Sequence, residues 1–216
     1  MYKRQPTNPS VPDGAHHVAF AYSADGKDRF TTVWPNLNLL DGTKHFSGDW
    51  KNSIGWTVDS TTYKGLTVKK RTEPWGGISK TFTAPKDGTY TFSAYVKSSG
   101  NNANATRFVL VDDKGTSIVP AKKMGHDFDW LRDSFSITLK ADKKVSATYE
   151  MTGSGSDSIL WTAGHKWEEG STATPWMPSF SEVTAEDYPS YIGTYTDNNS
   201  NEQSTDPEKY TWKKIE

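Results

Sequence analysis

Hydrophobic and polar residues alternate along several short segments of the chain, and helical periodicity is almost absent. In residues 89–97, every second position is apolar, and polar residues occupy most of the positions between them. The apolar set of this segment is Tyr90, Phe92, Ala94 and Val96. The same pattern recurs at residues 66–68, 78–82, 135–139 and 145–151. A period of two places successive side chains on opposite faces, so the pattern predicts β-strands with one face in a core.

Turn-forming residues separate these segments at short and regular intervals. Examples are Asp41-Gly42, Lys64-Gly65 and the run from Pro85 to Gly88. Glycine, proline, asparagine and aspartate interrupt strands because they favour the backbone angles of tight turns. Many short antiparallel strands with such turns predict an all-β fold, and we expect a jelly-roll β-sandwich.

The two ends of the chain differ from its middle. Residues 16–35 and 190–216 each hold only one or two predicted strands, too few to bury a core alone. We therefore expect the ends to pair as a small β module, interrupted by the jelly roll of residues 36–180 and rejoined through a linker at 181–189. The first five residues resemble a translated sequencing-library adapter, so we expect residues 1–15 to be a disordered or artefactual leader.

The composition excludes several classes of partner. The chain holds 25 basic and 26 acidic residues, so no charge excess predicts binding to nucleic acid or to an anionic membrane. It has no cysteine, and no apolar run long enough to span a bilayer. Nine Trp, ten Tyr and nine Phe are unusually many for so polar a chain, and a neutral partner suits this balance best.

Several segments resemble a known family of phage proteins. The pair "HHVAFAYSADGKDRFTT" and "SYIGTYTDNNSNEQSTDPEKYTWKKI" resembles a small module of minor tail proteins from phages of lactic-acid bacteria and streptococci. The segments "NLLDGTKHFSGDW", "GGISKTFTAPKDGTYTFSAYVKSS" and "AGHKWEEGSTATPWMP" resemble a phage-borne carbohydrate-binding module of jelly-roll type. One departure is Trp167, where relatives usually carry an aliphatic residue.

This resemblance implies a role in host recognition. Such modules belong to tail or baseplate proteins of the virion and contact the cell-wall polysaccharide of a Gram-positive host. Other phage tail proteins are the further partners that the resemblance implies. Two alternatives stay open: a structural tail domain that contacts only other phage subunits, and an accessory domain of a cell-wall glycoside hydrolase.

Saccharide recognition needs flat aromatic faces for the pyranose rings and polar groups for the hydroxyls. Trp75 is the strongest candidate, because it lies in a loop rich in proline and glycine, where its ring can stand exposed. Trp56 is expected to line the same groove, although a core position suits it equally well. Tyr63 and Trp50 are weaker candidates, since each has a plausible structural position.

The remaining candidates lie on one predicted sheet face and on a loop that overhangs it. Tyr95 and Lys97 point away from the apolar set of their strand, and Arg107 on the next strand is expected to join them. His126 and Asp127, in the following loop, could bind hydroxyls. The alternative for all five is an ordinary solvent-facing surface.

The other tryptophans divide between core and surface. We expect Trp130 in the core and Trp176 at the closure of the sandwich, and the sequence leaves the face of Trp161 open.

Neither catalysis nor a cofactor is predicted. No pair of carboxylates has the spacing of a glycosidase, and none of the five histidines forms an H-E-x-x-H motif. A structural calcium ion is possible, because the chain offers Asp41, Asp59, Asp157 and Glu169, but their spacing does not assign a site.

Overall fold

The chain divides into two compact units in a computed structural model, which describes residues 14–111, 116–153 and 157–216. One unit combines the described residues up to Pro35 with Thr184–Glu216, and the other is Asn36–Val183. Most of the expected leader and two expected turns, at residues 114–115 and 153–156, lie wholly or partly outside the described residues. No helix in the part that the structure describes is long and apolar enough to span a membrane.

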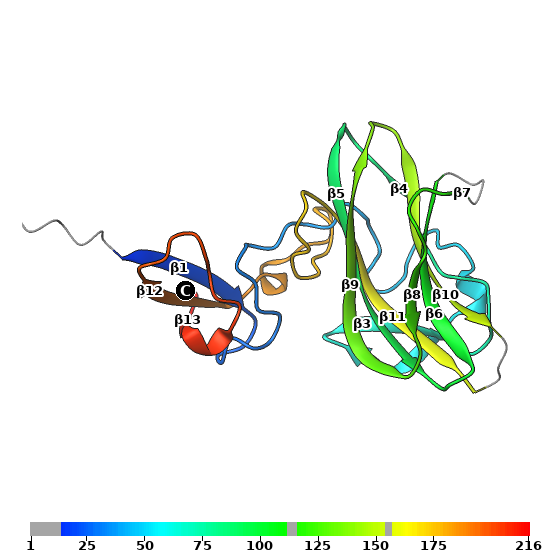
Figure 1. Ribbon diagram of the computed structural model, residues 1–216, viewed down its shortest axis with the longest axis horizontal. Helices are drawn as coiled ribbons and strands as arrows, with labels where there is room; N and C mark the ends of the chain where they lie inside the picture. The colour runs from blue at the N-terminus through cyan, green and yellow to red at the C-terminus, as the bar shows by residue number, and fades with distance from the viewer. Residues whose placement is uncertain (1–13, 112–115, 154–156) are drawn as a thin grey trace, which may run out of the picture. The chain divides into compact units, whose positions relative to one another are not determined.

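The small unit is a three-stranded antiparallel sheet built from both ends of the chain (Figure 1). Its strands are β1 (Ala15–Ala21), β12 (Tyr191–Asp197) and β13 (Thr211–Lys214), in the order β1-β12-β13. β1 and β12 pair from Ala15 opposite Asp197 to Ala21 opposite Tyr191. Two short 3-10 helices, Ala185–Asp187 and Pro207–Lys209, precede β12 and β13.

The inserted unit is a sandwich of two antiparallel sheets. One sheet has the order β2-β3-β11-β5-β9, and the other has the order β4-β10-β6-β7, with β8 paired to β6. The strands are β2 (Thr57–Tyr63), β3 (Leu66–Arg71), β4 (Phe82–Thr83), β5 (Gly88–Ser99), β6 (Ala103–Val111), β7 (Thr116–Ser117), β8 (Lys122–Gly125), β9 (Phe128–Leu139), β10 (Lys144–Gly153) and β11 (Ile159–Glu169). A 3-10 turn at Ser53–Gly55 precedes β2. The predicted all-β fold, with a jelly-roll sandwich inserted into a module made by the chain ends, is confirmed.

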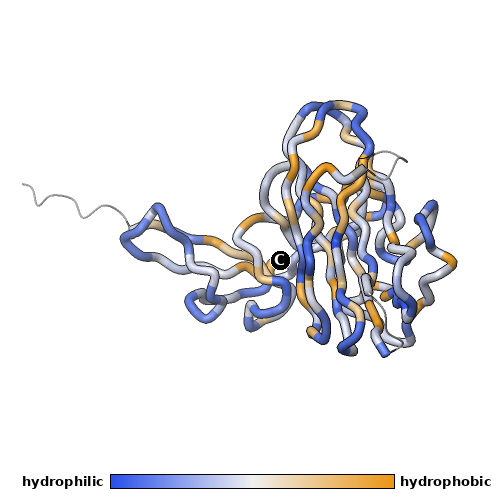
Figure 2. Tube along the Cα trace, turned by 45° about the vertical axis from the view of Figure 1, so that its right-hand side comes forward, coloured by the Kyte–Doolittle hydropathy of each residue, from blue (hydrophilic) through white to orange (hydrophobic). Residues whose placement is uncertain are grey.

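The core lies between the two sheets and follows the predicted alternation. Tyr90, Phe92, Ala94 and Val96 of β5 pack inward with the apolar face of β10. Figure 2 shows hydrophobic colour along the strands of the sandwich and hydrophilic colour at most of the connecting turns. Trp167 is fully buried and stacks on Phe82, with ring centroids 4.8 Å apart. Burying one such aromatic side chain contributes about 3 kcal/mol.

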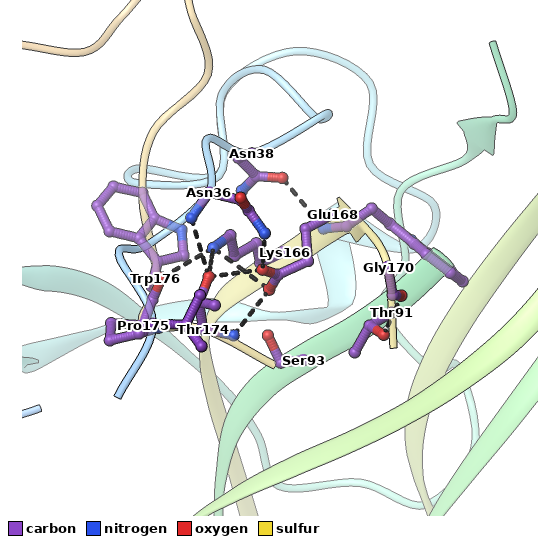
Figure 3. A network of polar contacts seen from close by, with 12 residues as sticks. Asn36, Asn38, Thr91, Ser93, Lys166, Glu168, Gly170, Thr174, Pro175 and Trp176 are labelled. Atoms are coloured by element: carbon purple, nitrogen blue, oxygen red, sulfur yellow. Dashed lines mark hydrogen bonds and ion pairs between the residues drawn. The ribbon is translucent and has the colours of Figure 1, made fainter. Parts of the chain in front are cut away.

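A buried polar network joins the start and the end of the inserted unit (Figure 3). Lys166 Nζ donates to Thr174 Oγ1 at 2.8 Å and to Pro175 O at 2.9 Å, and it lies 3.3 Å from the Glu168 carboxylate. The Asn36 amide donates to Glu168 at 3.1 Å, and the Asn36 backbone N–H donates to Thr174 Oγ1 at 3.0 Å. Burial lowers the pKa of Lys166 to about 8, although Glu168 opposes this change. The network brings the two ends of the sandwich together, as insertion into another unit requires.

Trp176 reinforces the same closure, as the sequence predicts. Its indole N–H donates to Thr43 Oγ1 at 3.0 Å, which links the end of the sandwich to its beginning.

Candidate functional site

The structure buries two of the aromatic rings that the sequence predicts to be exposed. Trp56 is 3% exposed, because it packs into the core where the chain enters β2 and donates its indole N–H to Gly76 O at 2.8 Å. Tyr95 is 5% exposed, because it packs with Leu66 and Trp176. The prediction that these two rings lie bare along a groove is therefore wrong.

Arg107 also lies inside the sandwich rather than on a sugar-facing surface. Its Nη1 donates to both carboxylate oxygens of buried Asp133, at 2.8 and 2.7 Å. The Tyr149 hydroxyl and Lys122 Nζ also donate to Asp133, each at 2.7 Å. Burial and the neighbouring Asp133 raise the pKa of Tyr149 well above its ordinary value. The expectation that Arg107 joins Lys97 on one face is wrong, because this charge cluster holds it between the sheets.

The other four candidates remain accessible to solvent. Trp75 is 58% exposed, and Lys97 is partly exposed. His126 and Asp127 are exposed in the turn between β8 and β9, where Asp127 adopts a φ of 55°. Their role in binding stays a prediction.

Aromatic residues gather on the outer face, which is the side of the sheet β2-β3-β11-β5-β9 that points away from the core. Tyr63 and Trp130 stack with centroids 4.4 Å apart and an interplanar angle of 16°. These rings come from the two edge strands of the sheet, β2 and β9, so the pair reaches across the outer face. Tyr63 also contacts the Tyr95 ring edge-on, at 4.9 Å. Trp130 is therefore partly buried on the outer face, where it packs against a second hydrophobic cluster that includes Tyr95 and Trp176 and not in the main core between the sheets.

Trp161 lies on the same face and is held by its polar neighbours. Its indole N–H donates to Asp59 Oδ1 at 3.3 Å, and Lys70 Nζ lies 3.1 Å from the same carboxylate oxygen. Lys97 Nζ lies 5.0 Å from the centre of the Trp161 ring. A partly exposed indole with one fixed edge and a cation over its ring can offer apolar surface and a hydrogen-bond donor together.

Asp59 organises this part of the outer face. The Thr61 hydroxyl holds the pKa of the Asp59 carboxyl well below its usual range, and the Thr61 backbone N–H, Lys70 and the indole of Trp161 add to the effect. The carboxylate is therefore ionised at neutral pH and already occupied by donors. This environment suits a residue that orients its neighbours and does not suit a general acid, which must carry a proton.

Sequence reasoning assigned too little weight to three residues of this face: Trp161, Trp130 and Tyr63. Alternation along β11 could not place Trp161, because a bulge between Ala163 and Lys166 shifts the pairing register with β5. Gly164 has a φ of 63° within this bulge, so Trp161 faces outward and Trp167 inward despite their even spacing. The one signal available was the glycine within a strand pattern, which indicates a bulge.

No group of three or more histidine, cysteine, aspartate or glutamate residues that could hold a metal occurs among the residues that the structure describes. All four oxygen donors considered for calcium have other partners, since Asp41 accepts from the Ser181 hydroxyl at 3.3 Å. Asp59 pairs with Lys70, Glu169 pairs with Lys86 at 2.7 Å, and Asp157 accepts from the Asn102 amide at 2.7 Å.

Comparison with known proteins gives a match among solved structures alone. No family model matches the sequence, and no curated protein matches it. Two carbohydrate-binding modules resemble part of the chain. A family 16 module has 16% identity and a TM-score of 0.43, and covers 62% of this chain and 100% of its own. A xylan-binding domain from Paenibacillus barcinonensis has 19% identity and a TM-score of 0.45, and covers 64% of this chain and 99% of its own.

One match extends over both units and confirms the resemblance that the sequence indicates. The matched chain belongs to the tripod from the baseplate of bacteriophage Tuc2009. It has 28% identity and a TM-score of 0.64, and the alignment covers 94% of this chain and 79% of the other. The protein is therefore similar, in sequence and in fold, to a component of a phage baseplate.

Proposed function

We propose that the protein is a non-catalytic, polysaccharide-binding component of a phage tail or baseplate. Its ligand is the cell-wall polysaccharide of a Gram-positive host, and binding contributes to host recognition and adsorption. The similarity to a phage baseplate component supports the place of action, and the outer face supports the chemistry.

The observation that carries the proposal is the fixed, partly exposed ring of Trp161 on the outer face. Asp59 holds the indole N–H, so the ring loses little conformational freedom when a pyranose stacks on it. Lys97 can donate to hydroxyl or acidic groups of the same sugar. The stacked pair Tyr63–Trp130 adds further aromatic surface from the two edge strands.

Polysaccharide retardation in native gels tests this function. Purified cell-wall polysaccharides from several Gram-positive species, and soluble galactan, xylan and β-glucan, are cast into the gels. Wild-type protein is expected to be retarded by at least one polymer. Trp161→Ala is expected to bind about tenfold more weakly, which corresponds to about 1.4 kcal/mol.

Trp34→Ala is the matched control. Trp34 is 41% exposed and belongs to the small unit, so the substitution removes an exposed indole that is not part of the sheet carrying Trp161. Unchanged retardation of Trp161→Ala, with its circular dichroism and Tm intact, would refute a binding role for this face.

A structural role is the second candidate, and the small unit favours it. Val33 and Trp34 are 45% and 41% exposed, and Trp34 stacks on Tyr188 with centroids 5.5 Å apart. Exposed aromatic and aliphatic side chains of this kind serve as anchors in protein–protein interfaces. Incorporation of Trp161→Ala into virions separates the two roles. If the outer face binds polysaccharide and the small unit makes the structural contacts, the variant virions should assemble normally and adsorb less well to the host.

A further inference from the structure

Trp75 has a backbone conformation that is unfavourable for its residue type. It adopts a φ of 63°, in the left-handed region that L-residues with a side chain rarely occupy. Its neighbour Gly76, with a φ of 62°, could take such a conformation at little cost, whereas a tryptophan cannot. Strain of this kind persists where surrounding contacts impose it, and it is concentrated at functional positions.

Side chains from the body of the sandwich fix the loop around Trp75. Arg71 Nε donates to Glu73 O at 2.9 Å, and Trp56 Nε1 donates to Gly76 O at 2.8 Å. The Asn52 amide donates to Gly77 O at 2.7 Å. These bonds hold the backbone on both sides of Trp75, and its own backbone N–H donates to Met151 O of β10 at 2.8 Å. The loop is thus held rigidly while it presents the indole to solvent.

The Trp75 side chain itself contributes little to the packing of the protein. It is 58% exposed, and no acceptor within the described residues takes a hydrogen bond from its indole N–H. Of the four buried tryptophans, Trp50, Trp56 and Trp176 donate their indole N–H to protein oxygens, whereas the indole N–H of Trp167 has no acceptor among the described residues. A structural role for Trp75 would predict much deeper burial, since all four buried tryptophans are at most 7% exposed.

A carboxylate lies close to the same loop. Glu150 of β10 lies beside Gly77, and its side chain is partly exposed. A flat indole face and a carboxylate acceptor are the two kinds of group that bind the apolar face and the hydroxyls of a pyranose. Arg71 lies 4.0 Å from the exposed carboxylate Glu73 and balances only one of the two carboxylates near the loop, so the remaining negative charge disfavours an acidic sugar here.

We propose that Trp75 is a second saccharide contact, separate from the outer face, and that its pyranose ligand is a neutral sugar. The site lies where the chain crosses from one sheet to the other. The chain leaves the first sheet after β3, and Ile78 forms a β-bridge with Tyr149 of β10 in the second sheet. Trp161, in contrast, lies on the outer face of the other sheet. That the ligand is a saccharide rests on the proposed function. The Trp75 contact itself does not require the outer face to bind.

Native-gel retardation of four proteins tests the inference: wild type, Trp75→Asn, Trp161→Ala and the double variant. The probes are the purified cell-wall polysaccharides and the soluble galactan, xylan and β-glucan. Trp75→Asn is expected to bind about tenfold more weakly, and the double variant is expected to show no retardation. Ile54→Asn is the matched control, because Ile54 is fully exposed in the adjacent turn and should not affect binding.

The stability of Trp75→Asn separates function from structure. Asparagine tolerates the left-handed region, so the Tm of this variant is expected to equal or exceed that of the wild type. If both the Tm and the binding of Trp75→Asn fall, Trp75→Tyr separates a binding role from a folding role. Because this variant keeps an aromatic ring, it should bind within threefold of the wild type. Failure of this rescue overturns the inference.

The remaining outcomes distinguish this inference from the proposed function. Wild-type binding by Trp75→Asn, together with weakened binding by Trp161→Ala, overturns the second contact alone. Loss of binding in Trp75→Asn, with normal binding in Trp161→Ala, supports the Trp75 contact and removes the outer face. A wild-type protein that no polysaccharide retards overturns both.

Discussion

His165 should make the stability of the protein depend on pH from about pH 6.5 downward, which is above the pH at which most carboxylates begin to titrate. The side chain is 1% exposed, at the bulge of β11, and aromatic rings surround it. These rings belong to Phe46, Trp50, Phe92 and Tyr149, with centroids 5.3 to 5.9 Å away. Neither a carboxylate nor any other anion among the described side chains is hydrogen-bonded to the imidazole.

The hydrogen bonds assign the neutral tautomer of this histidine. The Thr162 hydroxyl donates its one proton to Tyr95 O at 3.0 Å. Thr162 Oγ1 must therefore accept from His165 Nε2, which lies 2.8 Å away. A second proton on the ring would place a cation among buried aromatic rings, which is strongly unfavourable.

The size of the effect follows from the two pKa values. Burial lowers the pKa of His165 from 6.5 to about 3. Below pH 6.5 the unfolded chain gains a proton at this residue, and the folded protein does not until about pH 3, so the free energy of unfolding falls as the pH falls through this window. Each pKa unit corresponds to about 1.36 kcal/mol, so the loss between pH 7.5 and pH 4.5 should be about 3 kcal/mol.

Urea denaturation at pH 7.5, 6.5, 5.5 and 4.5 measures this loss in the wild type and in His165→Gln. The glutamine amide can still donate to Thr162, so the variant should fold and should lose most of the dependence on pH in this range. A variant whose free energy of unfolding falls with pH as steeply as that of the wild type would refute the reasoning. So would an NMR titration in which the His165 imidazole protonates near pH 6.5 in the folded protein.

Two further substitutions test the packing of each unit. Asp133→Asn removes the anion that neutralises buried Arg107, so it should lower the free energy of unfolding by about 3–5 kcal/mol in urea denaturation. A loss below about 1 kcal/mol would mean that Arg107 finds water instead. Gly193→Ala would place a Cβ 2.9 Å from the Trp212 ring, and such overpacking costs about 1–3 kcal/mol. Amide exchange in β12 should accelerate while that in β5 stays unchanged, and an equal acceleration in both strands would contradict a local effect.

The fold was predictable from the sequence because its strands follow simple periodicity. The apolar positions of β5 and β10 face one core. In both strands, the alternation of neighbouring residues was enough to predict which side chains point inward. Pairing of the two chain ends followed from a count of strands, since neither end could bury a hydrophobic face by itself. Strand periodicity and the number of strands in each chain end can both be read directly from the sequence.

The position of each aromatic ring was much less predictable. Trp56 follows a loop in the sequence, yet it lies in the core because the loop of residues 72–77 folds over it and accepts its indole proton. Trp130 begins a strand like a core residue, yet it points outward and meets Tyr63 from the opposite edge of the sheet. Contacts between residues so distant in the chain depend on sheet order and curvature, which periodicity does not encode.

Arg107 shows the same limitation for a charged residue. Its alternation with Phe108 placed it on the surface, because a buried guanidinium is costly without a partner. The partner, Asp133, comes from a strand of the other sheet, and 26 positions of sequence separate the two. No spacing rule links them, so the buried pair became visible through the structure alone.

Two saccharide contacts on one sandwich would change how strongly the protein binds a polymer. A single stacked ring gives weak binding, because the gain in contact must offset the loss of translational and rotational freedom. Trp75 and Trp161 belong to the same compact unit, so binding at one contact raises the effective concentration of sugar residues near the other. Short oligosaccharides would then bind weakly at either contact, whereas a chain long enough to span both would bind more tightly than their individual affinities predict. This dependence on chain length suits a polymeric ligand, and it explains how a module with partly exposed single rings could retain a polysaccharide without a deep pocket.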